Sequence, residues 1–264
     1  PTRRSSDLSR EIARAAFATA IVTLADKLEL SSSHVLFLPG AEAAELGRMG
    51  LLHRHSLQFH WKNHGYRTME DFLLSLPTKR RTQIRREMRA PEEQGLRIET
   101  LGRDELGPAL ADVAYELYLT TVDKFSWGRR YLNRAFFETV MSTMRDRVEL
   151  VAAKDGAGRI VAGAFNLRGD RTLYGRYWGA HEELRFLHFN VCFYHSIERC
   201  IRDGLDVFEP GAGGEHKLAR GFVPTLTHSV HYIRSPRLAL AVADFFARER
   251  EVLAAEIEGG STPR

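Results

Sequence analysis

The stretch VELVAAKDGAGRIVAGAFNLRGDRTLYGRYWG, residues 148–179, decides the fold. It contains three strand-like runs, at 148–153, 159–167 and 171–179. The first connection holds Asp155-Gly156 and the second holds Gly169-Asp170, and both dipeptides are typical of tight hairpins. The stretch therefore predicts an antiparallel meander of three strands.

A helix and a further strand follow the meander. Apolar residues recur with helical spacing from Leu184 to Ile201, and Gly204 ends this pattern before a short strand at 205–209. A strand, a helix and a strand in this order imply a right-handed crossover, so strands 171–179 and 205–209 should be parallel neighbours. The chain is completed by a glycine-rich turn, a short basic helix, a strand near 227–233 and a helix over 236–255.

This order of elements resembles the GNAT acyltransferase fold. In that fold two neighbouring parallel strands splay apart, and the gap between them holds the acyl donor beside the acceptor amine. The resemblance implies the α/β class, with a mixed sheet, flanking helices and a GNAT-like acyl-CoA N-acyltransferase fold. The resemblance therefore implies that the donor lies between strands 171–179 and 205–209, at strand ends of the kind where open α/β sheets bind ligands.

The first half of the chain is predicted to be mainly helical. An amphipathic helix is expected over 9–30, strands are expected at 34–38 and 57–61, and a short helix lies between those strands. Further helices are expected over 69–76, 78–90, 104–122 and 131–145, with a turn at Ser126-Trp127-Gly128.

Charge and hydropathy limit the classes of partner. The formal charge of +4 permits a phosphate-bearing ligand, but a general nucleic-acid coat would need more basic residues on one face. No apolar run reaches the roughly 18 residues of a membrane span, and no segment resembles a signal peptide. We therefore expect a cytoplasmic protein without a membrane span. Its oligomeric state is not predicted.

Five motifs carry a closer resemblance. They are QFHWKNHGY at 58–66, KRRTQIRRE at 79–87, LYGRYWGA at 173–180, LHFNVCFYHSIE at 187–198 and FEPGAGGEHKLARGFVP at 208–224. Together they resemble the FemAB-like family of predicted N-acyltransferases, over about residues 32–251. The resemblance implies transfer of an acyl or aminoacyl group from a thioester or tRNA donor to an amine, linked to cell-wall peptide biosynthesis.

The same resemblance suggests a domain division. Residues 1–8, PTRRSSDL, look like a sequencing-adapter sequence read in frame and are treated as a non-native extension. Residues 9–56 are interpreted as the remnant of a preceding half-domain, 57–256 as the GNAT-like domain, and 257–264 as a disordered tail. Since family members are usually longer at the N-terminus, we expect the natural protein to extend further in that direction.

The glycine-rich segment after strand 205–209 is the strongest candidate site. Gly211, Gly213 and Gly214 allow a tight turn that can point N–H groups at an anion. The next two helical turns supply an acid, an imidazole and two cations: Glu215, His216, Lys217 and Arg220. Such a cluster offers a base for an attacking amine and donors for an oxyanion, which acyl transfer requires. The alternative is a plain glycine loop beside a solvated charged helix.

The family resemblance bears on this segment in two further ways. Fem transferases carry a lysine before a glycine-phenylalanine pair near their acceptor site, and Lys217 with Gly221-Phe222 looks similar. The family usually shows glutamate where this chain has Asn190, and glutamine where it has Gly213. Loss of a carboxylate at Asn190 would remove a possible general base.

Two other segments hold candidates for donor binding. Strand alternation places Arg176 and Trp178 on one face, where Arg176 either forms a salt bridge in the core or faces the ligand. The helix after the meander begins where GNAT folds contact the donor, which makes His188 a catalytic candidate. His188, Cys192 and His195 share a helical face, but packing explains them better than a metal, so no metal site is predicted.

The segment 79–89 is heavily basic. Its cations include Lys79, Arg81, Arg85 and Arg89, which suit bidentate phosphate recognition of a tRNA, a nucleotide donor or coenzyme A. The alternative interpretation is a solvated surface helix with one apolar edge.

The donor and the acceptor stay open at this point. Acyl-CoA is expected by fold analogy only, because residues 181–188 replace the R/Q-x-x-G-x-G/A loop that cradles its pyrophosphate in GNAT enzymes. Aminoacyl-tRNA is the alternative donor, and a small molecule or a peptide would supply the acceptor amine. A noncatalytic anion-binding or nucleotide-binding module that retains the fold is the rival hypothesis.

Overall fold

The structure is a computed structural model that describes residues 3–124 and 130–260, apart from the side chains of 3–8, 215, 256 and 258–260. The predicted turn at Ser126-Trp127-Gly128 lies outside these ranges. The chain forms two compact units. One comprises Pro1–Gln58 and Pro224–Arg264, and the other comprises Phe59–Val223. The strands β2 (Leu52–Lys62) and β8 (Val223–Ile233) contribute residues to both units.

The sheet of the unit Phe59–Val223 contains the predicted meander. Its strands follow the order β2-β7-β6-β5-β4-β3. They are β3 (Arg97–Leu101), β4 (Val148–Lys154), β5 (Ile160–Arg168), β6 (Thr172–Ala180) and β7 (Val207–Glu209). Among these pairs β6 and β7 are parallel, whereas the others are antiparallel. The predicted crossover and the mixed sheet are therefore confirmed.

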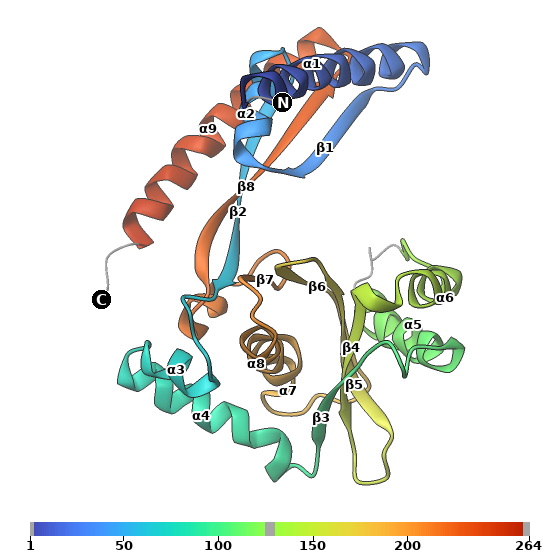
Figure 1. Cartoon of the computed structure of the whole chain (residues 1–264), viewed down its shortest axis with the longest axis vertical. Helices are drawn as coiled ribbons and strands as arrows, with labels where there is room; N and C mark the ends of the chain where they lie inside the picture. Colours follow the sequence, from blue (N-terminus) through green and yellow to red (C-terminus); the bar gives the residue numbers. More distant parts are fainter. Residues whose placement is uncertain (1–2, 125–129, 261–264) are drawn as a thin grey trace. The chain divides into compact units, whose positions relative to one another are not determined.

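Helices cover both faces of this sheet (Figure 1). On one face lie α5 (Pro108–Val122) and α6 (Arg134–Thr143), which bury an aromatic core around Phe137 against β4 and β5. On the other lies a helix made of α7 (Leu187–Phe189), a π-helical turn (Asn190–Tyr194) and α8 (His195–Arg202), with α3 (Met69–Leu74) and α4 (Thr78–Glu93). Trp61, Phe193 and Phe208 are buried in the core on that side. The flanking helices agree with the predicted α/β class.

A glycine in the LYGRYWGA motif brings α5 close to β6. A Cβ added at Gly179 would lie 1.8 Å from the carbonyl oxygen of Leu117, so only glycine permits this approach. The hydroxyl of Thr121 donates a hydrogen bond of 2.6 Å to the Trp178 carbonyl, and the Ala180 amide donates to Thr120. These contacts fix the end of β6 that borders the candidate site.

Some helix and strand boundaries differ from those predicted from the sequence. Strand β3 was not predicted, because RIETL is short and carries charges at alternate positions. Helix α4 continues past the predicted end at Ala90, through Pro91 to Glu93. The short basic helix is a 3-10 helix over Glu215–Arg220. Residues 257–260, expected as part of a disordered tail, belong to α9 (Pro236–Gly260).

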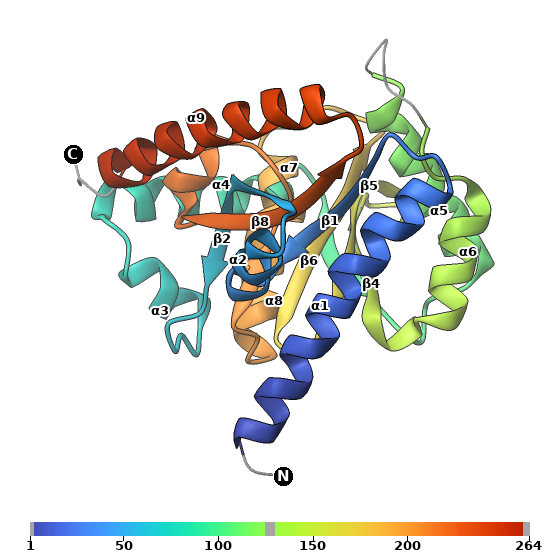
Figure 2. The ribbon, with the colours of Figure 1, turned by 90° about the horizontal axis from the view of Figure 1, so that it is seen from above.

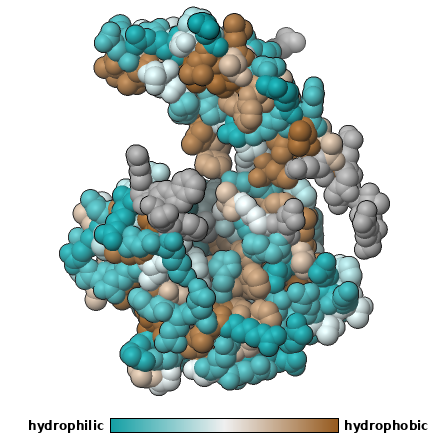
Figure 3. Space-filling view, turned by 180° about the vertical axis from the view of Figure 1, so that it is seen from behind, coloured by the Kyte–Doolittle hydropathy of each residue, from teal (hydrophilic) through white to brown (hydrophobic). Residues whose placement is uncertain are grey.

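The other unit is built on β1 (Ser32–Leu38), β8 and the first part of β2. Strand β1 is antiparallel to β8, and α2 (Gly40–Arg48) joins β1 to β2. The unit also includes the two longest helices, α1 (Arg3–Lys27) and α9 (Figure 2), each of 25 residues. Hydrophobic residues are visible on its surface in the upper part of Figure 3. Exposed apolar side chains of this unit include Phe37 and Leu240. No helix in the described ranges combines the length and apolarity that a bilayer span requires.

Candidate functional site

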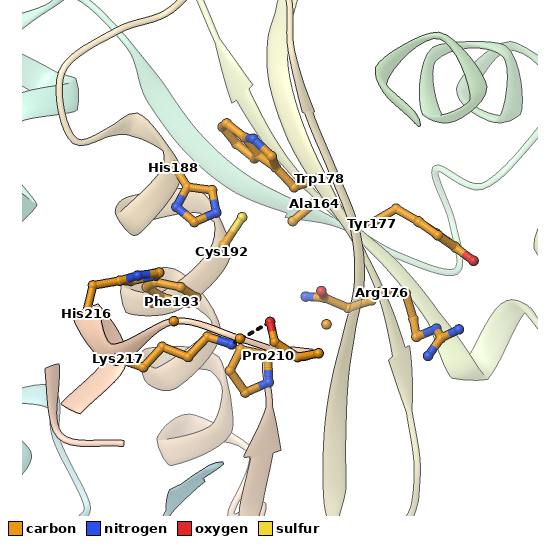
Figure 4. A pocket seen from close by; sticks show the side chains of 15 residues that line it. Ala164, Arg176, Tyr177, Trp178, His188, Cys192, Phe193, Pro210, His216 and Lys217 are labelled. Atoms are coloured by element: carbon orange, nitrogen blue, oxygen red, sulfur yellow. Dashed lines mark hydrogen bonds between the residues drawn. The ribbon is translucent and has the colours of Figure 1, made fainter. Parts of the chain in front are cut away.

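The parallel pair β6–β7 opens at one end. The register runs from Thr172↔Val207 to Tyr174↔Glu209, after which β7 ends and Pro210 follows. A cavity of about 280 Å³ lies beyond this point. It is bordered by β5, by the second half of β6, by the helix that begins at Leu187 and by the segment after β7 (Figure 4). The cavity therefore lies at the gap between these two strands, where the donor is predicted from the sequence.

Lys217 projects into this cavity from the 3-10 helix. Its side chain is only 3% exposed, and its Nζ donates hydrogen bonds to the carbonyls of Gly211 at 2.8 Å and Ala212 at 3.4 Å (Figure 4). An ammonium carries three donors, so two carbonyls leave one N–H for another acceptor. Burial lowers the pKa of Lys217 to about 8. The side chain is therefore mostly a cation at neutral pH.

The glycine-rich segment shapes the site through its backbone. Gly211, Gly213 and Gly214 all have positive φ angles, of 87°, 77° and 94°, which favour glycine. A Cβ at Gly214 would lie 2.4 Å from the His216 ring, so this glycine also makes room for the imidazole. The segment was expected to present N–H groups to an anion, whereas two of its carbonyl oxygens accept hydrogen bonds from Lys217.

Two neutral imidazoles border the same cavity. The His188 and His216 rings lie 6.4 Å apart between centroids, and both contact the ring of Phe193. Burial, followed by the charges of His216, Lys217 and Arg220, lowers the pKa of His188 to about 4. Burial also lowers the pKa of His216, which is the more exposed of the two. An exposed neutral imidazole can accept a proton from an incoming amine.

The π-helical turn separates three residues that were expected to share a face. His188 and Cys192 line the cavity, whereas the His195 ring bonds to the Thr100 hydroxyl at 2.8 Å. The expected common face is therefore wrong, because the insertion in the helix changes the angle between its two halves. Burial raises the pKa of the Cys192 thiol, which disfavours the reactive thiolate form.

A β-bulge alters the predicted orientation of Arg176. The register passes from Phe165↔Tyr177 to Asn166↔Gly175, which leaves Arg176 as the extra residue. Trp178 points into the cavity, while Arg176 and Tyr177 point to the opposite side of β6 (Figure 4). The Arg176 guanidinium lies 5.7 Å from the Tyr177 ring centroid. The prediction that Arg176 and Trp178 share a face is therefore wrong, although both residues border the cavity.

Arg220 forms a buried ion pair and does not project toward the cavity. Its guanidinium donates to both carboxylate oxygens of Glu87, at 3.0 and 2.9 Å, and lies 3.5 Å from the Phe189 ring centroid. The Tyr194 hydroxyl also donates to Glu87, and the side chains of Tyr194 and Glu87 are both buried. The structure thus assigns Arg220 to the packing of α4 against the 3-10 helix.

Asn190 is also placed away from the Lys217 cavity. Its side-chain amide donates to the carbonyls of Glu87 at 2.8 Å and Phe186 at 2.9 Å. The amide therefore ties the π-helical turn to α4. Asn190 was predicted to bind the substrate or the donor, with the family's glutamate at this position as a base beside the cleft. The structure instead directs the Asn190 side chain toward α4.

The basic residues of α4 form a separate surface. Lys79, Arg85 and Arg89 are exposed, and Arg81 is half-buried with its guanidinium 3.2 Å from the Thr78 hydroxyl. Arg85 forms an ion pair with Glu70. The cavity is lined by other elements, so any contact of α4 with phosphates would involve a part of the donor outside the cavity.

Two polar residues, one lining the cavity and one next to it in the chain, were not predicted. Asn166 lines the cavity from β5 and donates to the Ser196 hydroxyl at 3.4 Å; an amide within the apolar run AGAFNL was the available signal. Glu209 ends β7, and burial raises its pKa; its carboxylate lies 4.0 Å from His60 Nε2. The Glu215 side chain, a predicted catalytic group, lies outside the described part.

The segment between β6 and α7 does not fit a coenzyme A pyrophosphate. It carries two carboxylates, Glu182 and Glu183, and no glycine. Two of its backbone amides are engaged elsewhere, since His181 donates to the Val161 carbonyl at 2.9 Å and Arg185 donates to Gln94 Oε1 at 3.2 Å. A pyrophosphate cradle needs free N–H groups and little negative charge.

A mixed sheet whose parallel strands open onto a ligand-sized cavity defines a GNAT-like fold. The FemAB-like family model, described as peptidoglycan biosynthesis/recognition, matches residues 4–262. The chain belongs to the FemAB-like family. The comparison with curated proteins found no match.

Solved structures share this fold at low sequence identity. L-PGS from Bacillus licheniformis aligns with a TM-score of 0.58 at 10% identity, over 85% of this chain and 76% of that chain. FemX aligns with a TM-score of 0.55 at 13% identity, over 89% and 80%. A conserved protein of unknown function from Bacteroides thetaiotaomicron aligns with a TM-score of 0.54 at 16% identity, over 82% and 74%.

Proposed function

We propose that the chain transfers an aminoacyl group from an ester donor of the aminoacyl-tRNA type to the amine of a peptide, in the cavity that holds Lys217. The observation that carries this proposal is a buried ammonium, held by two carbonyls, beside neutral imidazoles at the open end of a parallel strand pair. Membership of a family described by peptidoglycan biosynthesis or recognition supports a peptide acceptor.

Each step of the reaction has a candidate group. The acceptor nitrogen attacks the ester carbonyl, and its proton passes to the neutral imidazole of His216. The remaining N–H of Lys217 stabilises the oxyanion of the tetrahedral intermediate. When the carbon–oxygen bond of the ester breaks, the imidazolium returns the proton to the leaving ribose hydroxyl, while the new amide stays on the acceptor.

An ester donor is favoured over acyl-CoA for two reasons. The segment after β6 offers carboxylates where a pyrophosphate would lie. The basic face of α4 instead suits an extended phosphate backbone, because arginine binds phosphates bidentately. In a thermal-shift experiment we expect charged tRNA, and not coenzyme A, to raise the melting temperature. Stabilisation by coenzyme A with charged tRNA inert would reverse the assignment, and no response to either would favour a noncatalytic module.

Replacing Arg81, Arg85 and Arg89 together by glutamine should weaken tRNA binding and flatten its salt dependence. Each lost phosphate contact removes about 0.7 to 0.9 from the slope of log K against log salt concentration. The matched control replaces Arg103, Arg130 and Arg159 by glutamine. These three residues lie outside α4, and their replacement removes the same number of positive charges. Equal losses in both triple variants, measured by filter binding at several salt concentrations, would mean that α4 is an ordinary solvated helix.

The rate of transfer should fall on the alkaline side above about pH 8. The ammonium form of Lys217 is required, and it is present below its folded pKa of about 8 and lost as the pH rises through it. Substitution Lys217→Arg should retain the positive charge, and the fall in the transfer rate should then begin at a higher pH. A pH profile of kcat/KM that is the same for both proteins would argue against a role for the Lys217 proton.

A further inference from the structure

Three histidines converge on the sheet of the unit that contains β1. His53 and His55 are two residues apart on β2, so they share a face, and His228 lies on the neighbouring strand β8. One nitrogen from each ring can be chosen so that all three lie within 4.8 Å of one another. The ring centroids are 4.6 to 5.3 Å apart, and each side chain is half-buried.

The spacing of these nitrogens suits a metal ion. His53 Nε2 and His228 Nδ1 are 3.2 Å apart. Two nitrogens bound to zinc at 2.0–2.1 Å in tetrahedral geometry are separated by about 3.3 Å. One nitrogen from His55 completes a set of three that all lie within 4.8 Å of one another. The three imidazoles are thus grouped closely enough to face one ion.

Helix α2 leaves space for the imidazoles. A Cβ added at Gly40 would lie 2.9 Å from His228 Nε2, and one at Gly47 would lie 3.2 Å from the His53 Cβ. The two glycines are seven residues apart, which places them on one face of the helix. Any larger residue at either position would press on a histidine, so α2 and the histidines are fitted to each other.

A neighbouring positive charge limits the affinity of this cluster for a dication. The nearby Arg250 opposes a second positive charge. Its guanidinium is exposed to solvent and donates to the His53 carbonyl at 3.2 Å. Solvent screens the repulsion between Arg250 and a bound dication, so we expect the cluster to bind the ion with moderate affinity.

We propose that His53, His55 and His228 form a binding site for a divalent first-row transition ion, with zinc as the best fit. Three imidazoles favour zinc, nickel or copper over magnesium or calcium, which prefer oxygen ligands. The ion would join β2 to β8 within one unit of the chain. This site is independent of the Lys217 cavity and of the proposed transfer reaction.

Calorimetric titration of tag-free protein with zinc chloride tests the proposal. We expect one ion per chain, and cobalt should give the visible absorption of a tetrahedral site. His53→Gln and His228→Gln should each weaken zinc binding by at least about 100-fold, because losing a ligand costs more than losing its supporting contacts. The matched control is His34→Gln, which removes a member of the His34–His231 pair, whose Nδ1 atoms lie 2.7 Å apart on β1 and β8.

Three results would overturn the site. One is the absence of stoichiometric zinc binding by the wild-type protein. Another is unchanged affinity in both His53→Gln and His228→Gln. Circular dichroism of each variant establishes that it is folded, and His55→Gln replaces any variant that is not. Equal weakening by His34→Gln would likewise contradict the proposal, since it would indicate general histidine binding.

Discussion

Substitution Lys217→Met is expected to lower the rate of aminoacyl transfer by at least about 100-fold, with little change in melting temperature. Loss of one preorganised oxyanion donor costs about this much in enzymes whose site is otherwise intact. Methionine fills a similar volume, and removing an ammonium that burial disfavours offsets the two hydrogen bonds lost at Gly211 and Ala212. Single-turnover rates and thermal unfolding of the same preparations provide the two readouts.

Lys79→Met is the matched control for this prediction. It removes a lysine from the exposed surface of α4, outside the cavity. We expect it to weaken donor binding slightly and to leave the rate at saturation unchanged. A rate for Lys217→Met within about threefold of the wild type would remove Lys217 from the reaction, whatever its position. A large fall in melting temperature would instead assign Lys217 to the packing of the glycine-rich segment.

Substitution Glu87→Ala should destabilise the protein by about 3–5 kcal/mol. Glu87 is 1% exposed and Arg220 is 5% exposed, so removal of the carboxylate leaves a buried guanidinium without its counter-charge. The free energy of unfolding in urea measures the loss. Replacing both partners, with Glu87→Leu and Arg220→Met, should recover much of it because no buried charge then remains.

The exposed pair Arg85–Glu70 supplies the contrast on the same helix. Both side chains are about half exposed, so Arg85→Ala should cost no more than about 1 kcal/mol. If Glu87→Ala were as mild as Arg85→Ala, the buried pair would not be what holds the 3-10 helix against α4. The position of Lys217 would then need another explanation.

Apart from β3, the order of elements and the place of the cavity could be predicted because they depend on local signals. Hairpin dipeptides, the periodic helix after them and Pro210 at the end of β7 are all visible in the sequence. The placement of His216 and Lys217 at the cavity follows from the same features, because the glycines after Pro210 turn the chain back toward β6.

The remaining site residues depend on tertiary contacts that a sequence pattern does not contain. The bulge that turns Arg176 away from Trp178 arises in the pairing of β5 with β6. The π-helical turn that separates His188 from His195 has no distinctive residues. Arg220 was predicted to be a ligand-binding cation because its partner Glu87 is 133 residues distant, within a segment described as heavily basic. A single carboxylate on the apolar edge of that helix was the signal that pointed to an ion pair.

Transfer of label from aminoacyl-tRNA to a peptide tests the central claim most directly. The donor is tRNA charged with a mixture of radiolabelled amino acids, and the acceptor is an N-terminally blocked peptide with a free lysine amine. The account predicts that the wild-type protein moves label to the peptide and that Lys217→Met does so at 1% of that rate or less, by the estimate of about 100-fold given above. Transfer at equal rates by both proteins, or transfer from acetyl-CoA with charged tRNA inert, would contradict it.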